Sequence, residues 1–216
     1  MKRFIQMGAM ILSLGFLAGA PVQAEDAATR VDYVTLAVPQ PTSDPSKIDV
    51  VEMFSYGCSH CNAFDPLLHK WVAALPKDVV FVRIPVVFRE SWEALARAYY
   101  VVEMLGVSDK THTALFKAVH EDKQRIEDID ALAKFFVAQG IDEKQFRDAY
   151  NSFGVAAKIN RAKQMTQRYG INGVPTLVIN GKYRTSASEA GSHEGMLKAA
   201  DKLIEQERAA LKTAAP

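Results

Sequence analysis

Two cysteines separated by two residues, Cys58 and Cys61, are the only cysteines in this 216-residue chain. They lie in the stretch 54–61 (FSYGCSHC), after the apolar run 50–54 and before a helix-like pattern over 62–74. A strand that delivers a Cys-X-X-Cys pair to the first turn of a helix is typical of thiol–disulfide chemistry. We therefore predict that this pair is the reactive centre.

The position of Cys58 at a helix start predicts a stabilised thiolate. Backbone N–H groups of the first turn lack intrahelical partners, and the helix dipole is positive there. Such surroundings lower a cysteine pKa from ~8.5 to roughly 3.5–7.5. Cys61 falls on the same helical face but deeper, so we predict Cys58 as the nucleophile and Cys61 as the resolving cysteine.

His60, between the two cysteines, indicates the direction of electron flow. An imidazole beside a thiolate adds a donor or a positive charge, which stabilises the anion. A stabilised thiolate favours the reduced protein and makes the disulfide more oxidising. The sequence therefore predicts a disulfide donor, with His60 as a bystander in solvent left as the alternative.

Two other uses of the cysteine pair stay open. An inert bridge is disfavoured because closing so small a loop removes little entropy from the unfolded chain. A copper or zinc chaperone would bind through Cys58, Cys61 and His60, but a tetrahedral site needs four ligands and the chain has no second cysteine pair. The other histidines are expected in surface or capping roles: His69, His112, His120 and His193.

Glu52 stands in the apolar run before the cysteines. A buried carboxylate is costly unless it is paired. It therefore either pairs or caps locally, or lies beneath the cysteines as a proton acceptor for Cys61. Val174-Pro175 also precedes a strand, but only ~5–6% of X-Pro bonds are cis, so its sequence alone does not predict a cis peptide.

The N-terminus indicates export. Lys2 and Arg3 precede an apolar segment, 7–17, and the small-residue site 22–24. This pattern predicts a signal peptide, residues 1–24, cleaved after Ala24. A membrane anchor is the weaker alternative because spanning a bilayer takes ~20 apolar residues. The remaining chain carries 24 basic and 25 acidic side chains without a basic stripe, so no nucleic-acid partner is expected.

The elements around the cysteines alternate between strand and helix patterns. We expect strands over 33–38, 48–54 and 79–84, and a helix over 59–75 kinked at Pro66. Helix patterns then follow over 91–105, 109–121, 128–139, 142–153 and 155–169, with glycine as the stop signal after several of them. Strands over 176–179 and 182–185 flank the hairpin turn Asn180-Gly181, and a helix closes the chain over 193–211. This order predicts an α/β domain split by an all-helical block, with residues 174–175 brought towards the cysteines.

The strand, the Cys58-Ser59-His60-Cys61 motif, the kinked helix, Gly173-Val174-Pro175-Thr176 and the helical block together resemble the DsbA family of periplasmic thiol–disulfide oxidoreductases, over about residues 33–210. The resemblance implies a thioredoxin fold, 25–86 and 158–216, with an inserted all-helical domain, 87–157. It implies a cis Val174-Pro175 peptide against the disulfide, where the Val174 backbone pairs with extended substrate. Glu52, six residues before Cys58, matches the family's buried acidic position.

The resemblance also implies partners. These are reduced, unfolded exported proteins as substrates and a DsbB-type quinone-linked membrane oxidase, with the Cys58–Cys61 disulfide as the only redox group and no metal. We expect a periplasmic monomer. The family's dipeptide is commonly Pro-His, so Ser59, expected at the substrate-binding face, leaves the strength of oxidation open.

Rival activities within this fold are a disulfide isomerase or reductase and a redox-inactive relative that conjugates glutathione. Isomerases usually carry an N-terminal dimerisation region, for which residues 25–47 leave little room. Glutathione-conjugating relatives need not retain both cysteines.

Overall fold

A five-stranded mixed sheet organises the computed structural model, which describes residues 32–214. The strands are β1 (Val34–Thr35), β2 (Ile48–Phe54), β3 (Val79–Pro85), β4 (Thr176–Ile179) and β5 (Tyr183–Ser186), in the order β1-β5-β4-β2-β3. Central β2 pairs in parallel with β3 and antiparallel with β4. The two segments of the sheet thus meet across the helical block, as the sequence predicts.

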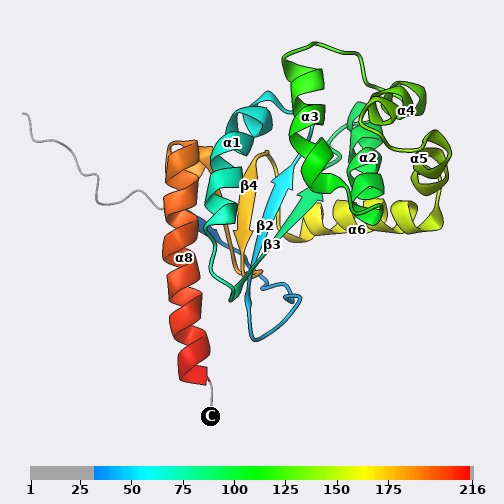
Figure 1. Cartoon of the computed structure of the whole chain (residues 1–216). Coiled ribbons are helices and arrows are strands. Elements are labelled where there is room, and N and C mark those ends of the chain that lie inside the picture. The colour runs from blue at the N-terminus through cyan, green and yellow to red at the C-terminus, as the bar shows by residue number, and fades with distance from the viewer. Residues whose placement is uncertain (1–31, 215–216) are drawn as a thin grey trace, which may run out of the picture.

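The helices are arranged in two groups around this sheet. They are α1 (Ser59–Ala73), the 3-10 turn η1 (Glu90–Trp92), α2 (Glu93–Met104), α3 (Ser108–His120), α4 (Ile129–Ala138), α5 (Glu143–Tyr150), α6 (Phe153–Arg168), α7 (Ala187–Ala190) and α8 (His193–Ala214). In Figure 1, α1 and α8 lie on one side of the view and α2–α5 gather on the other, with α6 leading back to the sheet. This is the thioredoxin fold with a helical insertion.

The alternation of side chains along β2 divides the core. Ile48 and Val50 pack with Phe64 and Leu68 of α1 and with residues of α8. Val51, the next residue along the strand, packs on the opposite face with Met165 of α6. Because Glu52 follows the same alternation as Val50, it lies on the α1 face, close to the cysteine helix.

A third apolar cluster places the cysteines where the strand–helix unit β2–α1 meets the helical insertion. Cys58 and Cys61 pack with Phe54 and Tyr56 and with apolar side chains from α2 to α6. The core of the helical insertion therefore surrounds the segment that precedes Cys58. Each large side chain fully buried in such a core contributes about 1.5–3 kcal/mol.

Helix caps set most of the boundaries in the insertion. The side chains of Asp128, Asp142 and Ser152 accept hydrogen bonds from backbone N–H groups in the first turns of α4, α5 and α6. The expected helix over 142–153 is wrong at its end, because α5 stops at Tyr150 and Ser152 caps the next helix. Gly154 consequently lies in the first turn of α6 instead of ending α5.

The hairpin turn before β5 matches the prediction, whereas β1 is shorter than predicted. Asn180 and Gly181 both have positive φ, +50° and +62°, and Lys182 N–H donates to Ile179 O at 3.0 Å, so the predicted hairpin turn is present. β1 is shorter than the strand expected over 33–38, because its regular pairing with β5 ends after Thr35.

The structure bears on the expected domain boundary and on Pro66, but not on the expected signal peptide. The expected boundary at 157/158 falls inside α6, and Pro66 lies within α1. The expected signal peptide, residues 1–24, lies outside the described residues. Within residues 32–214, no helix has the length and apolar character needed to cross a bilayer.

Candidate active site

The cysteine pair occupies the first turn of α1. Cys58 is the N-cap residue, with extended backbone, and its Sγ accepts a hydrogen bond from Cys61 N–H at 3.4 Å. Both cysteines are free thiols; Cys58 is 8% exposed and Cys61 is fully buried. The predicted difference in depth between the two sulfur atoms is therefore present.

The pKa values of the two cysteines are shifted in opposite directions. A hydrogen bond from the Cys61 thiol, then backbone N–H donors of Cys61 and His60, lower the pKa of Cys58 to about 6, although partial burial opposes them. The charge of His60 also acts in this direction but contributes least of these. Burial raises the pKa of Cys61 far above its usual value, and the Cys58 sulfur adds to that effect. At neutral pH the pair therefore holds one thiolate and one thiol.

The loop before β4 lies against Cys58. The Val174-Pro175 peptide is cis, and Cys58 Sγ lies 3.4 Å from Val174 O across 116 residues of sequence. A pocket of about 190 Å³ beside this contact is lined by residues that include His60, Pro175 and His193. Ser59 and His60 are both exposed. The sheet thus brings together the cysteines and the loop that the resemblance pairs with them.

Comparisons with known proteins agree with this geometry. A family model described as a DSBA-like thioredoxin domain matches residues 79–199. The thiol:disulfide interchange protein DsbA of Pseudomonas aeruginosa is 41% identical over 202 residues, which cover 94% of this chain and 96% of the relative. The DsbA of Pseudomonas syringae pv. tomato is 39% identical over 214 residues, covering 99% and 100% of the two chains. The chain belongs to the DsbA family.

Solved structures of DsbA proteins share the fold. The crystal structure of Pseudomonas aeruginosa DsbA superposes with a TM-score of 0.81 at 42% identity, over 84% of this chain and 94% of that one. DsbA from Xylella fastidiosa gives a TM-score of 0.77 at 36% identity, over 82% and 96% of the chains. As a DsbA-family member, the protein is a thiol–disulfide oxidoreductase. Among the residues that the structure describes, no three His, Cys, Asp or Glu side chains are grouped as a metal site would require.

Glu52 is buried and paired. It is 1% exposed, and the parallel register of β2 and β3 places it opposite Arg83. Arg83 Nε donates to Glu52 Oε2 at 2.8 Å. Burial nevertheless raises the pKa of Glu52 to about 7, since the attraction of Arg83 offsets only part of the desolvation cost. The Glu52 charge in turn helps to raise the pKa of Cys61, so the local pairing and the location near Cys61 occur together.

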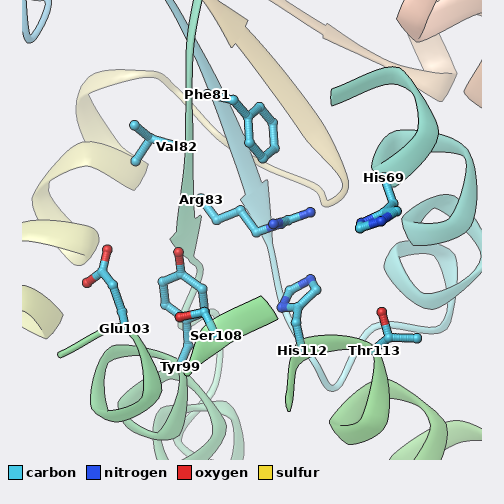
Figure 2. Close-up of a pocket in the computed structure, with 9 residues that line it drawn as sticks. All are labelled: His69, Phe81, Val82, Arg83, Tyr99, Glu103, Ser108, His112 and Thr113. Carbon is cyan, nitrogen blue, oxygen red and sulfur yellow. The ribbon is translucent and has the colours of Figure 1, made fainter. Parts of the chain in front are cut away.

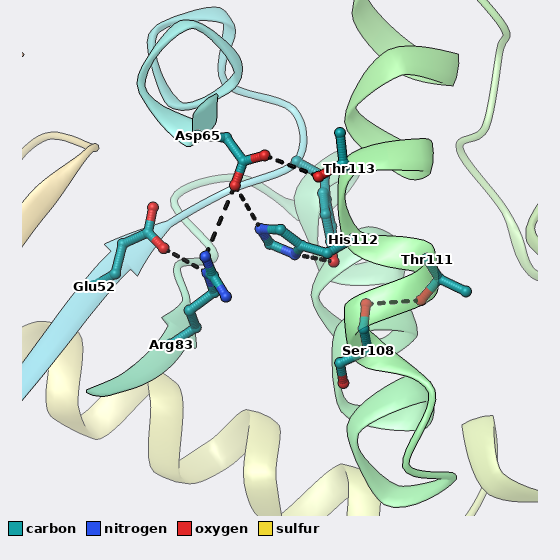
Figure 3. Close-up of polar contacts among 8 residues, drawn as sticks. Glu52, Asp65, Arg83, Ser108, Thr111, His112 and Thr113 are labelled. Carbon is teal, nitrogen blue, oxygen red and sulfur yellow. Dashed lines mark hydrogen bonds and ion pairs between the residues drawn. The ribbon is translucent and has the colours of Figure 1, made fainter. Parts of the chain in front are cut away.

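A chain of polar groups extends from Glu52 to α3 (Figure 3). Arg83 Nη2 lies 3.8 Å from Asp65 Oδ1, and His112 Nε2 lies 3.2 Å from the same oxygen. Thr113 Oγ1 donates to Asp65 Oδ2 at 3.2 Å. Arg83, His112 and Thr113 also line a pocket of about 220 Å³ (Figure 2).

The expected surface role of His112 is wrong, because the side chain is 6% exposed. His120 also has a specific partner: its Nε2 lies 2.7 Å from the carbonyl oxygen of Tyr56. The sequence spacing indicated that His112 is buried. It lies three residues before Leu115 and four before Phe116, and therefore on the apolar face of α3. Arg83 could similarly have been found as the one charged residue of β3.

Proposed function

We propose that this protein is a dithiol oxidase that donates its Cys58–Cys61 disulfide to reduced, newly exported proteins. The observation that carries the proposal is the unequal pair: a Cys58 thiolate stabilised at the start of α1 beside a buried, protonated Cys61. A stable Cys58 thiolate makes Cys58 a good leaving group and favours the reduced enzyme. Electrons therefore flow from the substrate to the protein.

The reaction proceeds through a mixed disulfide at Cys58. A substrate thiolate attacks Cys58 Sγ, the Sγ–Sγ bond breaks, and its electron pair passes to Cys61, which takes up a proton. The second substrate thiolate then attacks the substrate sulfur of the mixed disulfide, and Cys58 leaves as a thiolate. Two electrons move from the substrate dithiol to the enzyme, and the substrate gains one disulfide.

Glu52 and His60 assist at opposite sides of the pair. Glu52 exchanges the Cys61 proton: it accepts that proton when Cys61 must attack during reoxidation. Its pKa of about 7 suits proton exchange near neutral pH. His60 supports the Cys58 thiolate through its backbone N–H and its charge.

Substrate contacts the face made by Ser59, Val174 and Pro175. An extended peptide segment pairs with the Val174 backbone by strand addition, next to the sulfur that reacts. The adjacent 190 Å³ pocket accommodates a side chain of that segment. Because main-chain pairing is independent of side-chain identity, this mode suits many unfolded substrates.

The remaining expectations complete the proposal. The protein acts as a periplasmic monomer after removal of residues 1–24, with 87–157 as a helical domain inserted between 25–86 and 158–216. A DsbB-type quinone-linked membrane oxidase restores the disulfide. The disulfide itself is the redox group, without another cofactor.

The test is oxidation of a reduced, unfolded substrate protein by the Cys58→Ser variant. We expect catalysed oxidation to be lost, whereas wild-type-like rates would contradict the proposal. A redox titration of the wild-type pair in glutathione buffers separates an oxidase from a reductase. Reference values are about −120 mV for oxidising DsbA proteins and about −270 mV for thioredoxin, and a value near the latter would favour the reductase.

A further inference from the structure

His112 is a buried histidine of the helical insertion that contacts the active-site segment. Its ring lies 5.1–5.4 Å, centroid to centroid, from the rings of Phe54, Tyr56 and Phe116. Its Nδ1 is 2.7 Å from Tyr56 Oη, and its Nε2 is 3.2 Å from Asp65 Oδ1. The imidazole therefore bridges the residue two positions before Cys58 and a carboxylate of α1.

The two neighbours fix the tautomer of this imidazole. Burial raises the pKa of Tyr56 well above its usual value, so Tyr56 stays a phenol, which can donate to Nδ1 or accept from it. Asp65, beside Nε2, has a lowered pKa and is a carboxylate that only accepts, so the ring proton lies on Nε2 and Tyr56 donates to Nδ1. Burial also lowers the pKa of His112, which keeps the ring neutral. A neutral ring that accepts at Nδ1 carries its proton on Nε2. That N–H is 3.2 Å from Asp65 Oδ1, a close electrostatic contact that falls short of hydrogen-bond geometry.

Asp65 Oδ1 is the atom for which His112 and Arg83 compete. Arg83 holds Glu52 at 2.8 Å but lies 3.8 Å from Asp65 Oδ1, beyond ordinary hydrogen-bond length. The His112 N–H places a positive partial charge beside Asp65 in place of a closer guanidinium. Without it, the ionised Asp65 would attract Arg83 more strongly, at the expense of Glu52.

We infer that His112 is a positioning residue that, through the close approach of its Nε2–H to Asp65 Oδ1, keeps Arg83 on Glu52 and so sets the proton affinity of Glu52. The inference deepens the proposed function, because it rests on Glu52 as the proton acceptor for Cys61. It assigns the helical insertion a part in the chemistry: a side chain of α3 adjusts an acid on β2.

Other charged or titratable groups face this cluster from the surrounding elements. The charges of Arg83 and His69 act on His112 in addition to Asp65. The charges of Arg83 and Asp65 affect the pKa of Glu52. The charges of Arg83 and Glu52 also affect the pKa of Tyr99 in α2. None of these side chains is replaced by a substitution at His112, and Arg83 is the one whose position the inference expects to change.

Two amide substitutions separate the two ring nitrogens. Asparagine in His112→Asn places its amide near the position of Nδ1 and leaves nothing at Nε2, whereas glutamine in His112→Gln reaches the Nε2 position. The measurement is the ¹³C carboxyl titration of Glu52 in the reduced protein, assigned by loss of the signal in Glu52→Gln. We expect a wild-type midpoint of about 7. His112→Asn should raise it by about half a unit or more, a roughly threefold gain in proton affinity, and His112→Gln should leave it near wild type.

Equal midpoints in wild type and His112→Asn would overturn the inference, as would equal shifts in the Asn and Gln variants. Near-UV circular dichroism checks that each variant is folded. If His112→Asn does not fold, His112→Leu takes its place, because it also removes the Nε2–H while filling the apolar space: the midpoint must rise, and an unchanged or lower midpoint overturns the inference. The titration uses no substrate, so its result is separate from the activity test on Cys58→Ser.

Discussion

Replacing Cys61 with alanine, and with serine in a matched variant, tests what lowers the pKa of Cys58. The largest contribution to the lowered pKa is the hydrogen bond from the Cys61 thiol, followed by backbone N–H donors that both variants keep. With a pKa of about 6, Cys58 is ~90% thiolate at pH 7 and ~10% at pH 5. A cysteine of pKa ~9 would be only ~1% thiolate at pH 7. Alanine removes the side-chain donor, whereas serine keeps an O–H in its place.

The assay is the pH dependence of carboxamidomethylation by iodoacetamide, followed by mass spectrometry on the reduced protein. In the wild type, Cys61 is buried and stays protonated, so the modified residue is Cys58. We expect the wild-type rate to rise about tenfold from pH 5 to pH 7 and then to level off. Cys61→Ala should move the midpoint up by about one unit or more, and Cys61→Ser by clearly less.

The redox potential supplies a second reading of the same effect. At pH 7, a pKa of about 6 in place of 9.0 stabilises the reduced form by at most about 1.4 kcal/mol, or ~30 mV for two electrons. Solvent screening at the partly accessible sulfur reduces this figure. A wild-type rate that still climbs steadily above pH 7.5, or equal midpoints in the alanine and serine variants, would refute the reasoning.

Three further predictions concern stability. Because the pKa of Cys58 is lowered, its stabilising effect on the reduced fold is complete above the ordinary pKa of 9.0 and is lost as pH falls through about 6. The Tm of the reduced form minus that of the oxidised form, measured by calorimetry, should therefore be larger at pH 8 than at pH 5; a constant difference would contradict this. Gly57→Ala places a Cβ 2.5 Å from Trp92 Nε1, so it should cost about 1–3 kcal/mol in urea unfolding, and a neutral result would show that the indole moves freely. Phe136→Ala should cost about 3–5 kcal/mol, because that ring is 1% exposed, whereas Phe153→Ala, at 88% exposed, should stay within about 0.5 kcal/mol; similar losses in both would contradict the packing.

The sequence by itself determined the features that depend on local order along the chain. Cys58 at a helix start, the strand before it and the Asn180-Gly181 turn follow from nearest neighbours and periodicity, and all three are present. The helical character of residues 90–169 also followed from hydrophobic spacing. Helix ends were less certain where two signals competed, as Ser152 and Gly154 did.

Only the tertiary structure decided which distant side chains share a site. The β2–β3 register placed Arg83 opposite Glu52, and the packing of α3 placed His112 between Tyr56 and Asp65. The sheet set the Val174 carbonyl 3.4 Å from Cys58. These distances depend on how elements far apart in sequence pack together. For the same reason, sequence showed that Glu52 needed a partner, because burying an unpaired carboxylate is costly, but the partner itself became known only from the fold.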